Sequence, residues 1–131
     1  CKPMREDLTS VGFIELKIPE EVSKVLDSKE GTVLLMVNSV CGCAAGNARP
    51  AVKMSTTFSK KPDVFATVFA GQDVGATATA RKYMRPYPPS SPSIALFKDG
   101  NLVHFIERHH IEGRPAQMIA ENLEQAFNSY C

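Results

Sequence analysis

A single junction, where an apolar run leads into two closely spaced thiols, constrains the fold of this chain most. Residues 32–38 read Thr-Val-Leu-Leu-Met-Val-Asn, a continuous apolar run typical of a strand buried on both faces of a sheet. Cys41-Gly42-Cys43 follows, and then a helix-competent segment from Ala44 to Met54. A strand that leads directly into a helix indicates an alternating strand–helix architecture with a parallel sheet.

Helices and strands alternate along the rest of the chain. The predicted helices cover residues 3–11, 19 to about 28, 44–54, 74–84 and 115 onward, and the predicted strands cover residues 13–16, 32–38, 64–70, 93–98 and 102–106. Gly12 and the Lys29-Glu30-Gly31 segment are expected to end the first two helices, Asp73 to cap the fourth, and Pro50 to kink the third. Asp99-Gly100 is a strong hairpin signal between the last two strands. The buried face of the last helix is predicted to carry Met118, Ile119, Leu123, Ala126 and Phe127.

This order predicts an α/β, thioredoxin-like fold, with a central mixed sheet of about four to five strands flanked by helices. The 131 residues suit one domain covering 1–131, and an apolar content of 44% is enough for one core. A net charge of +1 and the absence of Trp argue against a nucleic-acid or membrane partner. No apolar run approaches the roughly 20 residues of a membrane span. The chain begins with Cys1, as a mature bacterial lipoprotein would, but a trimmed or disordered N-terminus is the commoner explanation and is expected here.

The cysteine pattern indicates thiol chemistry in a reducing, cytoplasmic setting. Of four cysteines, two are one residue apart and two lie at the chain ends, which does not suit a disulfide scaffold. A zinc site needs about four ligands, and the sequence offers no second cysteine pair, so no metal site is predicted. Metal transfer and purely structural cysteines remain as alternatives. A helix start lowers a thiol's pKa, and the thiolate is the attacking species.

Within this pair, Cys41 is the expected nucleophile and Cys43 the resolving thiol. Cys41 lies nearest the strand end, where a thiol can be exposed, whereas Cys43 is one step into the helix; the reverse assignment is the alternative. Side chains two residues apart on a helix diverge by roughly 200°, so a disulfide between them is strained and easily reduced. Such a site suits disulfide exchange better than strong reduction.

Other residues near the thiols are candidates for substrate binding. Ser91 and Pro92 precede the strand that begins at residue 93, and a cis Pro92 would present the Ser91 backbone groups to a substrate. From the sequence alone a trans peptide bond before Pro92 is commoner. The predicted thioredoxin-like fold favours the cis form instead. Asn38 and Arg49 are candidate contacts for a polar or anionic substrate; alternatively Asn38 caps the helix and Arg49 is solvated. Cys131 is expected to be peripheral, with a resolving role as the weaker alternative, and the histidines to pack or cap.

The chain resembles the bacilliredoxins, thioredoxin-like proteins of bacteria that make bacillithiol. The resemblance is carried by residues 37–46 (Val-Asn-Ser-Val-Cys-Gly-Cys-Ala-Ala-Gly), Ala48-Arg49-Pro50, residues 68–73 (Val-Phe-Ala-Gly-Gln-Asp), residues 89–93 (Pro-Ser-Ser-Pro-Ser), residues 103–106 (Val-His-Phe-Ile), Arg108-His109, Ile111-Glu112-Gly113, Pro3-Met4-Arg5 and Cys131. These long ungapped motifs cover nearly the whole chain.

The resemblance implies an oxidoreductase that removes bacillithiol from client proteins after oxidative stress. Cys41 would attack the mixed disulfide, and free bacillithiol or Cys43 would regenerate the enzyme. The expected site is Cys41 and Cys43, with Gly42, Asn38, Arg49, Ser91 and Pro92 as substrate contacts. The resemblance implies bacillithiol as co-substrate, and no resident cofactor is expected. The expected partners are bacillithiolated client proteins and a low-molecular-weight thiol, and the chain is expected to be a monomer or weak homodimer. A general disulfide isomerase and a small metal chaperone are the alternative functions.

Overall fold

The computed structural model describes residues 6, 8–27, 31–38, 42–70, 73–84, 93–111 and 114–131, without the side chains of residues 42–47 and 109. The elements are β1 (Ile14–Glu15), α2 (Pro19–Leu26), β2 (Thr32–Asn38), α3 (Gly42–Ser55), β3 (Val64–Phe69), α4 (Val74–Tyr83), β4 (Ser93–Lys98), β5 (Asn101–Ile106), α5 (Arg108–Ile111) and α6 (Ala116–Tyr130). At the N-terminus, Glu6, Leu8 and Thr9 are helical, and Gly12 follows with a φ of 100°.

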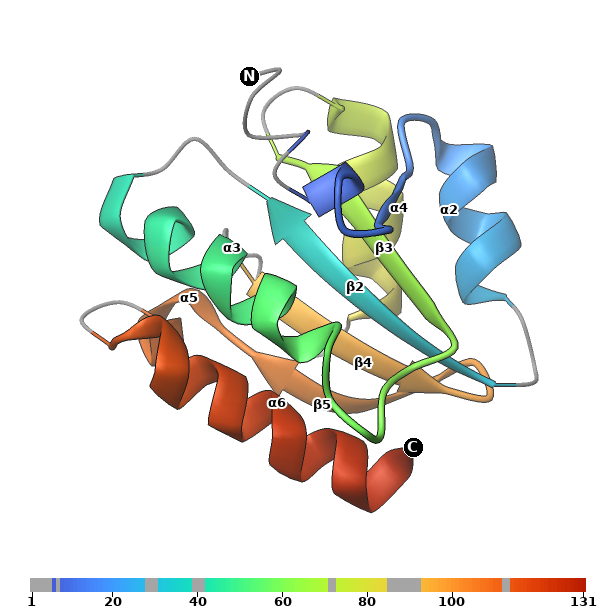
Figure 1. Cartoon of the computed structure of the whole chain (residues 1–131). Helices are drawn as coiled ribbons and strands as arrows, with labels where there is room; N and C mark the ends of the chain where they lie inside the picture. Colours follow the sequence, from blue (N-terminus) through green and yellow to red (C-terminus); the bar gives the residue numbers. More distant parts are fainter. Residues whose placement is uncertain are drawn as a thin grey trace.

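The five strands form one mixed sheet in the order β1-β3-β2-β4-β5. β1 and β2 both run parallel to β3, whereas β4 runs antiparallel to β2 and β5 antiparallel to β4. Helices α3 and α6 cover one face of the sheet, and α2 and α4 cover the other (Figure 1). The predicted mixed sheet of four to five strands flanked by helices is confirmed.

Strand β2 lies at the centre of the sheet, and all seven of its residues are buried. Leu34 and Met36 pack toward α3 and α6, whereas alternate residues such as Leu35 pack toward α2 and α4. Because successive side chains of a strand point to opposite faces, a strand covered on both sides must be apolar throughout. This explains the uninterrupted apolar run in the sequence.

The β4–β5 hairpin has the geometry that its turn residues favour. Asp99 has a φ of 52° and Gly100 a φ of 83°, so both central residues are in the left-handed region. Lys98 pairs with Asn101 on either side of this two-residue turn. Two central residues with positive φ are typical of the type I′ turn, whose twist matches that of the flanking strands. The predicted hairpin is confirmed, with β5 beginning one residue earlier than expected.

One predicted residue of a buried helix face, Met118 on α6, is wrong. Met118 on α6 is 51% exposed, and the buried positions are Ile119, Ala120, Leu123, Ala126 and Phe127. These five positions form one stripe of the helical repeat, with Met118 at its edge. Asp73 occupies the N-cap position of α4 as predicted, although its side chain makes no capping hydrogen bond. The short helix α5 was not predicted, because four residues carry no periodic signal.

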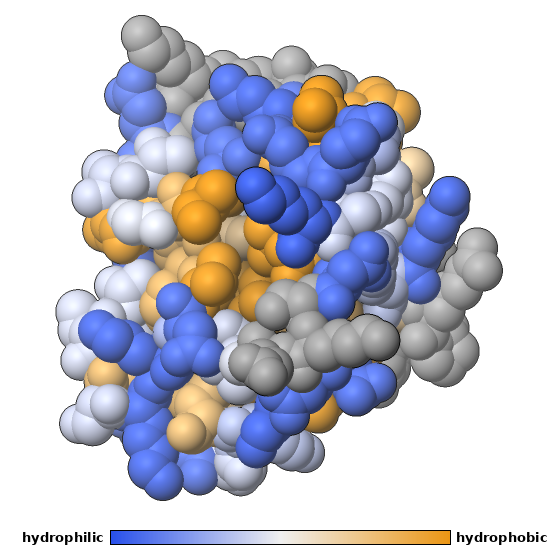
Figure 2. Space-filling model, turned by 90° about the vertical axis from the view of Figure 1, so that its right-hand side faces the viewer, coloured by the Kyte–Doolittle hydropathy of each residue, from blue (hydrophilic) through white to orange (hydrophobic). Residues whose placement is uncertain are grey.

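The surface carries some apolar side chains among polar ones. Figure 2 shows apolar atoms grouped within a mostly hydrophilic face. The exposed apolar residues include Ile14 in the edge strand β1 and Ile18 before α2. No helix in the described part of the chain combines the length and apolar character needed to cross a membrane.

Candidate functional site

The candidate site lies where β2 ends and α3 begins. Asn38 is the last residue of β2, and Gly42 is the first residue of α3. Cys41, Ser91 and Pro92 lie outside the described residues, and Cys43 is described only as a backbone position in the first turn of α3. The thiol pair predicted from the sequence therefore stands at the junction of the central strand and a 14-residue helix.

The start of α3 favours negative charge. The first turn of this helix contains no acidic residue. The unpaired backbone N–H groups at a helix start carry partial positive charge, which stabilises a thiolate relative to its thiol. The backbone at the start of α3 therefore favours the thiolate form of a cysteine that precedes Gly42.

Two of the predicted site residues, Asn38 and Arg49, meet in the structure. The Arg49 Nη1 group donates a hydrogen bond of 3.2 Å to the Asn38 Oδ1 atom. Asn38 is 1% exposed, whereas Arg49 on α3 is half-buried. The backbone oxygen of Asn38 also accepts a 2.9 Å hydrogen bond from the N–H of Ala70, just beyond β3. Asn38 therefore links β2, α3 and the end of β3. This link lies at the end of β2 that leads into the cysteine segment of the sequence.

Two buried hydroxyl groups near this edge were missed by the sequence reasoning. The Thr67 hydroxyl on β3 donates a 2.8 Å hydrogen bond to the backbone oxygen of Met36 on β2. Ser93 is 1% exposed, and its Oγ has no hydrogen-bond partner among the residues that the structure describes. Its backbone pairs with Val37, one residue from the end of β2. The sequence signal at Thr67 was a hydroxyl in an otherwise apolar strand, and Ser93 also ends the Pro-Ser-Ser-Pro-Ser motif of residues 89–93.

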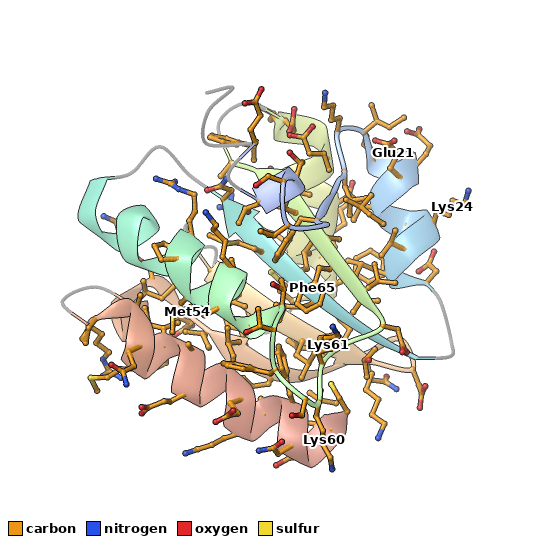
Figure 3. The ribbon with its side chains drawn as sticks, viewed as in Figure 1. Glu21, Lys24, Met54, Lys60, Lys61 and Phe65 are labelled. Carbon is orange, nitrogen blue, oxygen red and sulfur yellow. The ribbon has the colours of Figure 1, made fainter. Side chains whose placement is uncertain are left out.

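Cys131 lies at the opposite end of β2. Its thiol is placed beside Thr32, the first residue of β2, with Lys60 and Asp63 nearby. Figure 3 shows Lys60 at the same end of the molecule as the end of α6. Partial burial raises the pKa of the Cys131 thiol. Thr32 and Asn38 are separated by about 20 Å along the strand, which favours the peripheral role predicted for Cys131 over the resolving one.

The described histidine contacts support structural roles. His104 Nε2 lies 2.8 Å from Asn122 Oδ1 on α6, and His110 Nδ1 accepts a 3.3 Å hydrogen bond from the backbone N–H of Glu107 at the start of α5. These contacts agree with the prediction that the histidines pack or cap for His104 and His110, whereas the side chain of His109 lies outside the described part of the chain. Among the residues with described side chains, no group of three or more His, Cys, Asp or Glu is arranged to hold a metal ion.

Comparison with known proteins adds a family and a fold. The family model described as "Disulphide isomerase" matches residues 1–131. A bacilliredoxin of Cytophaga hutchinsonii is 56% identical over 126 residues, which are 96% of this chain and 93% of the relative. A bacilliredoxin of Halalkalibacterium halodurans is 54% identical over 130 residues, which are 99% of this chain and 90% of the relative.

Solved structures share the fold at low sequence identity. A putative oxidoreductase with a thioredoxin fold superimposes with a TM-score of 0.70 at 16% identity, covering 90% of this chain and 95% of that one. A mutant thioredoxin from Halobacterium salinarum gives a TM-score of 0.64 at 17% identity, covering 92% of this chain and 91% of that one. The predicted thioredoxin-like fold is confirmed.

Proposed function

Because the chain belongs to the bacilliredoxin family, whose members are thioredoxin-like thiol–disulfide oxidoreductases, we propose that it removes bacillithiol from client proteins through Cys41. The observation that carries the proposal is the start of α3 at Gly42, four residues after β2 ends at Asn38, with Cys43 in the first turn of α3 and Cys41 directly before that helix in the sequence. The positive end of a helix favours the thiolate form of a cysteine that stands at its start.

The first step is a thiol–disulfide exchange at Cys41. The Cys41 thiolate attacks the bacillithiol sulfur of the mixed disulfide. A new sulfur–sulfur bond forms between Cys41 and bacillithiol, and the bond to the client breaks. The client leaves as a thiolate that takes up a proton from water, so the client is reduced and bacillithiol now sits on Cys41.

Two routes regenerate the Cys41 thiolate. In the first, a free bacillithiol thiolate attacks the bacillithiol sulfur on Cys41, releasing bacillithiol disulfide and the Cys41 thiolate. In the second, the Cys43 thiolate attacks the Cys41 sulfur and releases bacillithiol; a low-molecular-weight thiol must then reduce the Cys41–Cys43 disulfide. Strain from the one-residue spacing makes that disulfide easy to reduce, so both routes return the enzyme to its dithiol form.

The remaining site residues have proposed roles in substrate binding. Arg49 has a donor geometry suited to anionic groups, and Asn38 holds it in place through the 3.2 Å hydrogen bond. The backbone of Gly42 and the Ser91-Pro92 segment are proposed to contact the client chain. The pairing of Ser93 with Val37 supports this, because it brings β4 to the sheet edge where β2 ends.

A general protein disulfide isomerase is the second candidate function. The description of the matching family model as a disulphide isomerase favours it. Refolding of a protein with scrambled disulfides separates the two functions, since an isomerase works at a rate independent of added bacillithiol. In either case we place the reaction in the cytoplasm, where thiols stay reduced, with client proteins and a small thiol as partners. We propose a monomer or weak homodimer without a resident cofactor.

Intact-mass spectrometry of the reduced protein tests the proposal. Brief exposure to oxidised bacillithiol is expected to add one bacillithiol at Cys41, with glutathione disulfide reacting slowly or not at all. In a de-bacillithiolation assay, Cys41→Ser is expected to abolish turnover, Cys43→Ser to retain part of it, and Cys131→Ser to match the wild type. Full activity of Cys41→Ser would overturn the proposal, and equal reaction with both disulfides would favour the general oxidoreductase.

A further inference from the structure

Helices α2 and α4 lie side by side on one face of the sheet and meet at two places (Figure 1). Near their starts, a Cβ added to Gly75 would lie 3.3 Å from the Pro19 ring, so the two helices approach closely there. Near their ends, the Tyr83 hydroxyl donates a 2.6 Å hydrogen bond to the Asp27 carboxylate. Both contacts join residues 56 positions apart, so the helices run in the same direction in a fixed register.

Between these two contacts the surface is hollow, because the side chains at the middle of the seam are small. Ser23 of α2 and Thr79 of α4 lie opposite each other in this register, and both line a groove of about 650 Å³. Sites for small ligands typically have volumes of about 300–1,000 Å³. Pro19 and Tyr83 also line the groove. It therefore offers hydroxyl groups at its middle and apolar rings toward its ends.

The groove carries opposite charges toward its two ends. Glu20 lines it in the first turn of α2, and Lys82 lines it in the last turn of α4. Neither side chain has an ion-pair partner within the residues that the structure describes. A full side-chain charge exceeds the charge of a helix terminus, which is about half a unit, so Glu20 makes its end negative and Lys82 makes the other positive.

The spacing of these charges selects the kind of ligand. In the register of the two helices, Lys82 lies six positions beyond the residue opposite Glu20, which is about 9 Å along the helix axis. A free amino acid carries its ammonium and carboxylate on one carbon and cannot span that distance. An extended peptide advances about 3.3–3.6 Å per residue, so about three residues separate its free ends as required.

We propose that the groove between α2 and α4 binds a short peptide of about three residues with free ends, its ammonium at Glu20 and its carboxylate at Lys82. The peptide groups then lie over Ser23 and Thr79, whose hydroxyls both donate and accept hydrogen bonds. Peptide binding here requires no step at Cys41, so it is independent of the proposed thiol exchange.

Titration of the isotope-labelled protein with tri-alanine, followed by nuclear magnetic resonance, tests the site. Saturable shifts are expected for backbone amides of residues 20–23 and 79–83, which include the lining of the groove. Tri-alanine with an acetylated N-terminus and tri-alanine with an amidated C-terminus should each bind about threefold more weakly, as the loss of one exposed charge pair would give. The peptide with both ends blocked should bind about tenfold more weakly.

Variants assign each end of the peptide to its partner. Glu20→Gln should weaken tri-alanine about threefold but should not weaken the acetylated peptide further, and Lys82→Met should behave in the same way with the amidated peptide. Thr79→Leu fills the middle of the groove with a good helix former and should abolish saturable binding. Glu124→Gln and Lys60→Met are the matched controls, because they remove the same charges from exposed positions outside α2 and α4 and should keep wild-type binding.

Three results would overturn the proposal, each in a variant shown by circular dichroism to be folded. The first is the absence of saturable shifts in α2 and α4 with tri-alanine. The second is equal binding of the free and the blocked peptides, or unchanged binding in Glu20→Gln and Lys82→Met. The third is unchanged binding in Thr79→Leu, which would place the peptide outside the groove. The exchange at Cys41 stands on its separate test by mass spectrometry.

Discussion

Replacing Phe127 by alanine tests whether the packing of α6 on the sheet and on α3 stabilises this fold. Phe127 is fully buried on α6, in the cluster that includes Leu34 of β2 and Val52 of α3. Its ring also meets the ring of Phe58 edge-on, with centroids 6.3 Å apart and planes inclined by 64°. Truncation removes this contact and leaves a cavity that the neighbouring elements can fill only in part.

The expected loss is large compared with the stability of a domain of this size. A buried Phe→Ala substitution costs about 3–5 kcal/mol, including the cavity, out of a typical total of about 5–15 kcal/mol. For a chain of 131 residues this corresponds to a fall in Tm of about 10–18 °C. Met118→Ala on the same helix is the control, because Met118 is 51% exposed, and its cost is expected to stay within about 0.5 kcal/mol.

Urea titration followed by far-ultraviolet circular dichroism measures both losses, since the chain has no Trp for fluorescence. The two variants should share the wild-type dependence of unfolding free energy on urea, so that the shift in midpoint reports stability. A cost below about 1.5 kcal/mol for Phe127→Ala, or an equal cost for Met118→Ala, would refute the assignment of the buried face of α6.

Three further predictions concern other parts of the molecule. Gly31→Ala should lower the unfolding free energy by more than about 1 kcal/mol. Gly31 has a φ of 90°, and an added Cβ would lie 2.6 Å from the Asp63 carboxylate. A neutral effect of this substitution in thermal unfolding would contradict the prediction. Thr67→Val should cost about 1 kcal/mol in urea titration by leaving the Met36 carbonyl without its 2.8 Å partner, and an increase in stability would count against that hydrogen bond. Burial raises the pKa of the Cys131 thiol, so less thiolate is present at neutral pH. Iodoacetamide should therefore label Cys131 more slowly at neutral pH than it labels a cysteine in an unfolded peptide, and the two rates should converge as the pH rises. Faster labelling of Cys131 would show that its pKa is lowered.

The sequence alone determined the elements whose signals are local. The boundaries of β2 and β4 were predicted to the residue, because a strand buried on both faces must be apolar along its whole length. The Asp99-Gly100 turn was equally clear, because few residues adopt positive φ at two successive positions. The thiol pair at a strand–helix junction was visible for the same reason: strand, cysteines and helix are adjacent in the chain.

Only the tertiary structure decided features that depend on residues far apart in the sequence. Asn38 and Arg49 were separate candidates, each with a structural alternative, until packing of α3 on the sheet brought them to 3.2 Å. Cys131 is placed at the start of β2, away from the thiol pair, by the direction in which α6 crosses the sheet. Met118 is exposed and Ala120 is buried, because a small rotation of an amphipathic helix decides which edge of its apolar stripe is covered. Such placements follow from the packing of whole elements, which local periodicity does not encode.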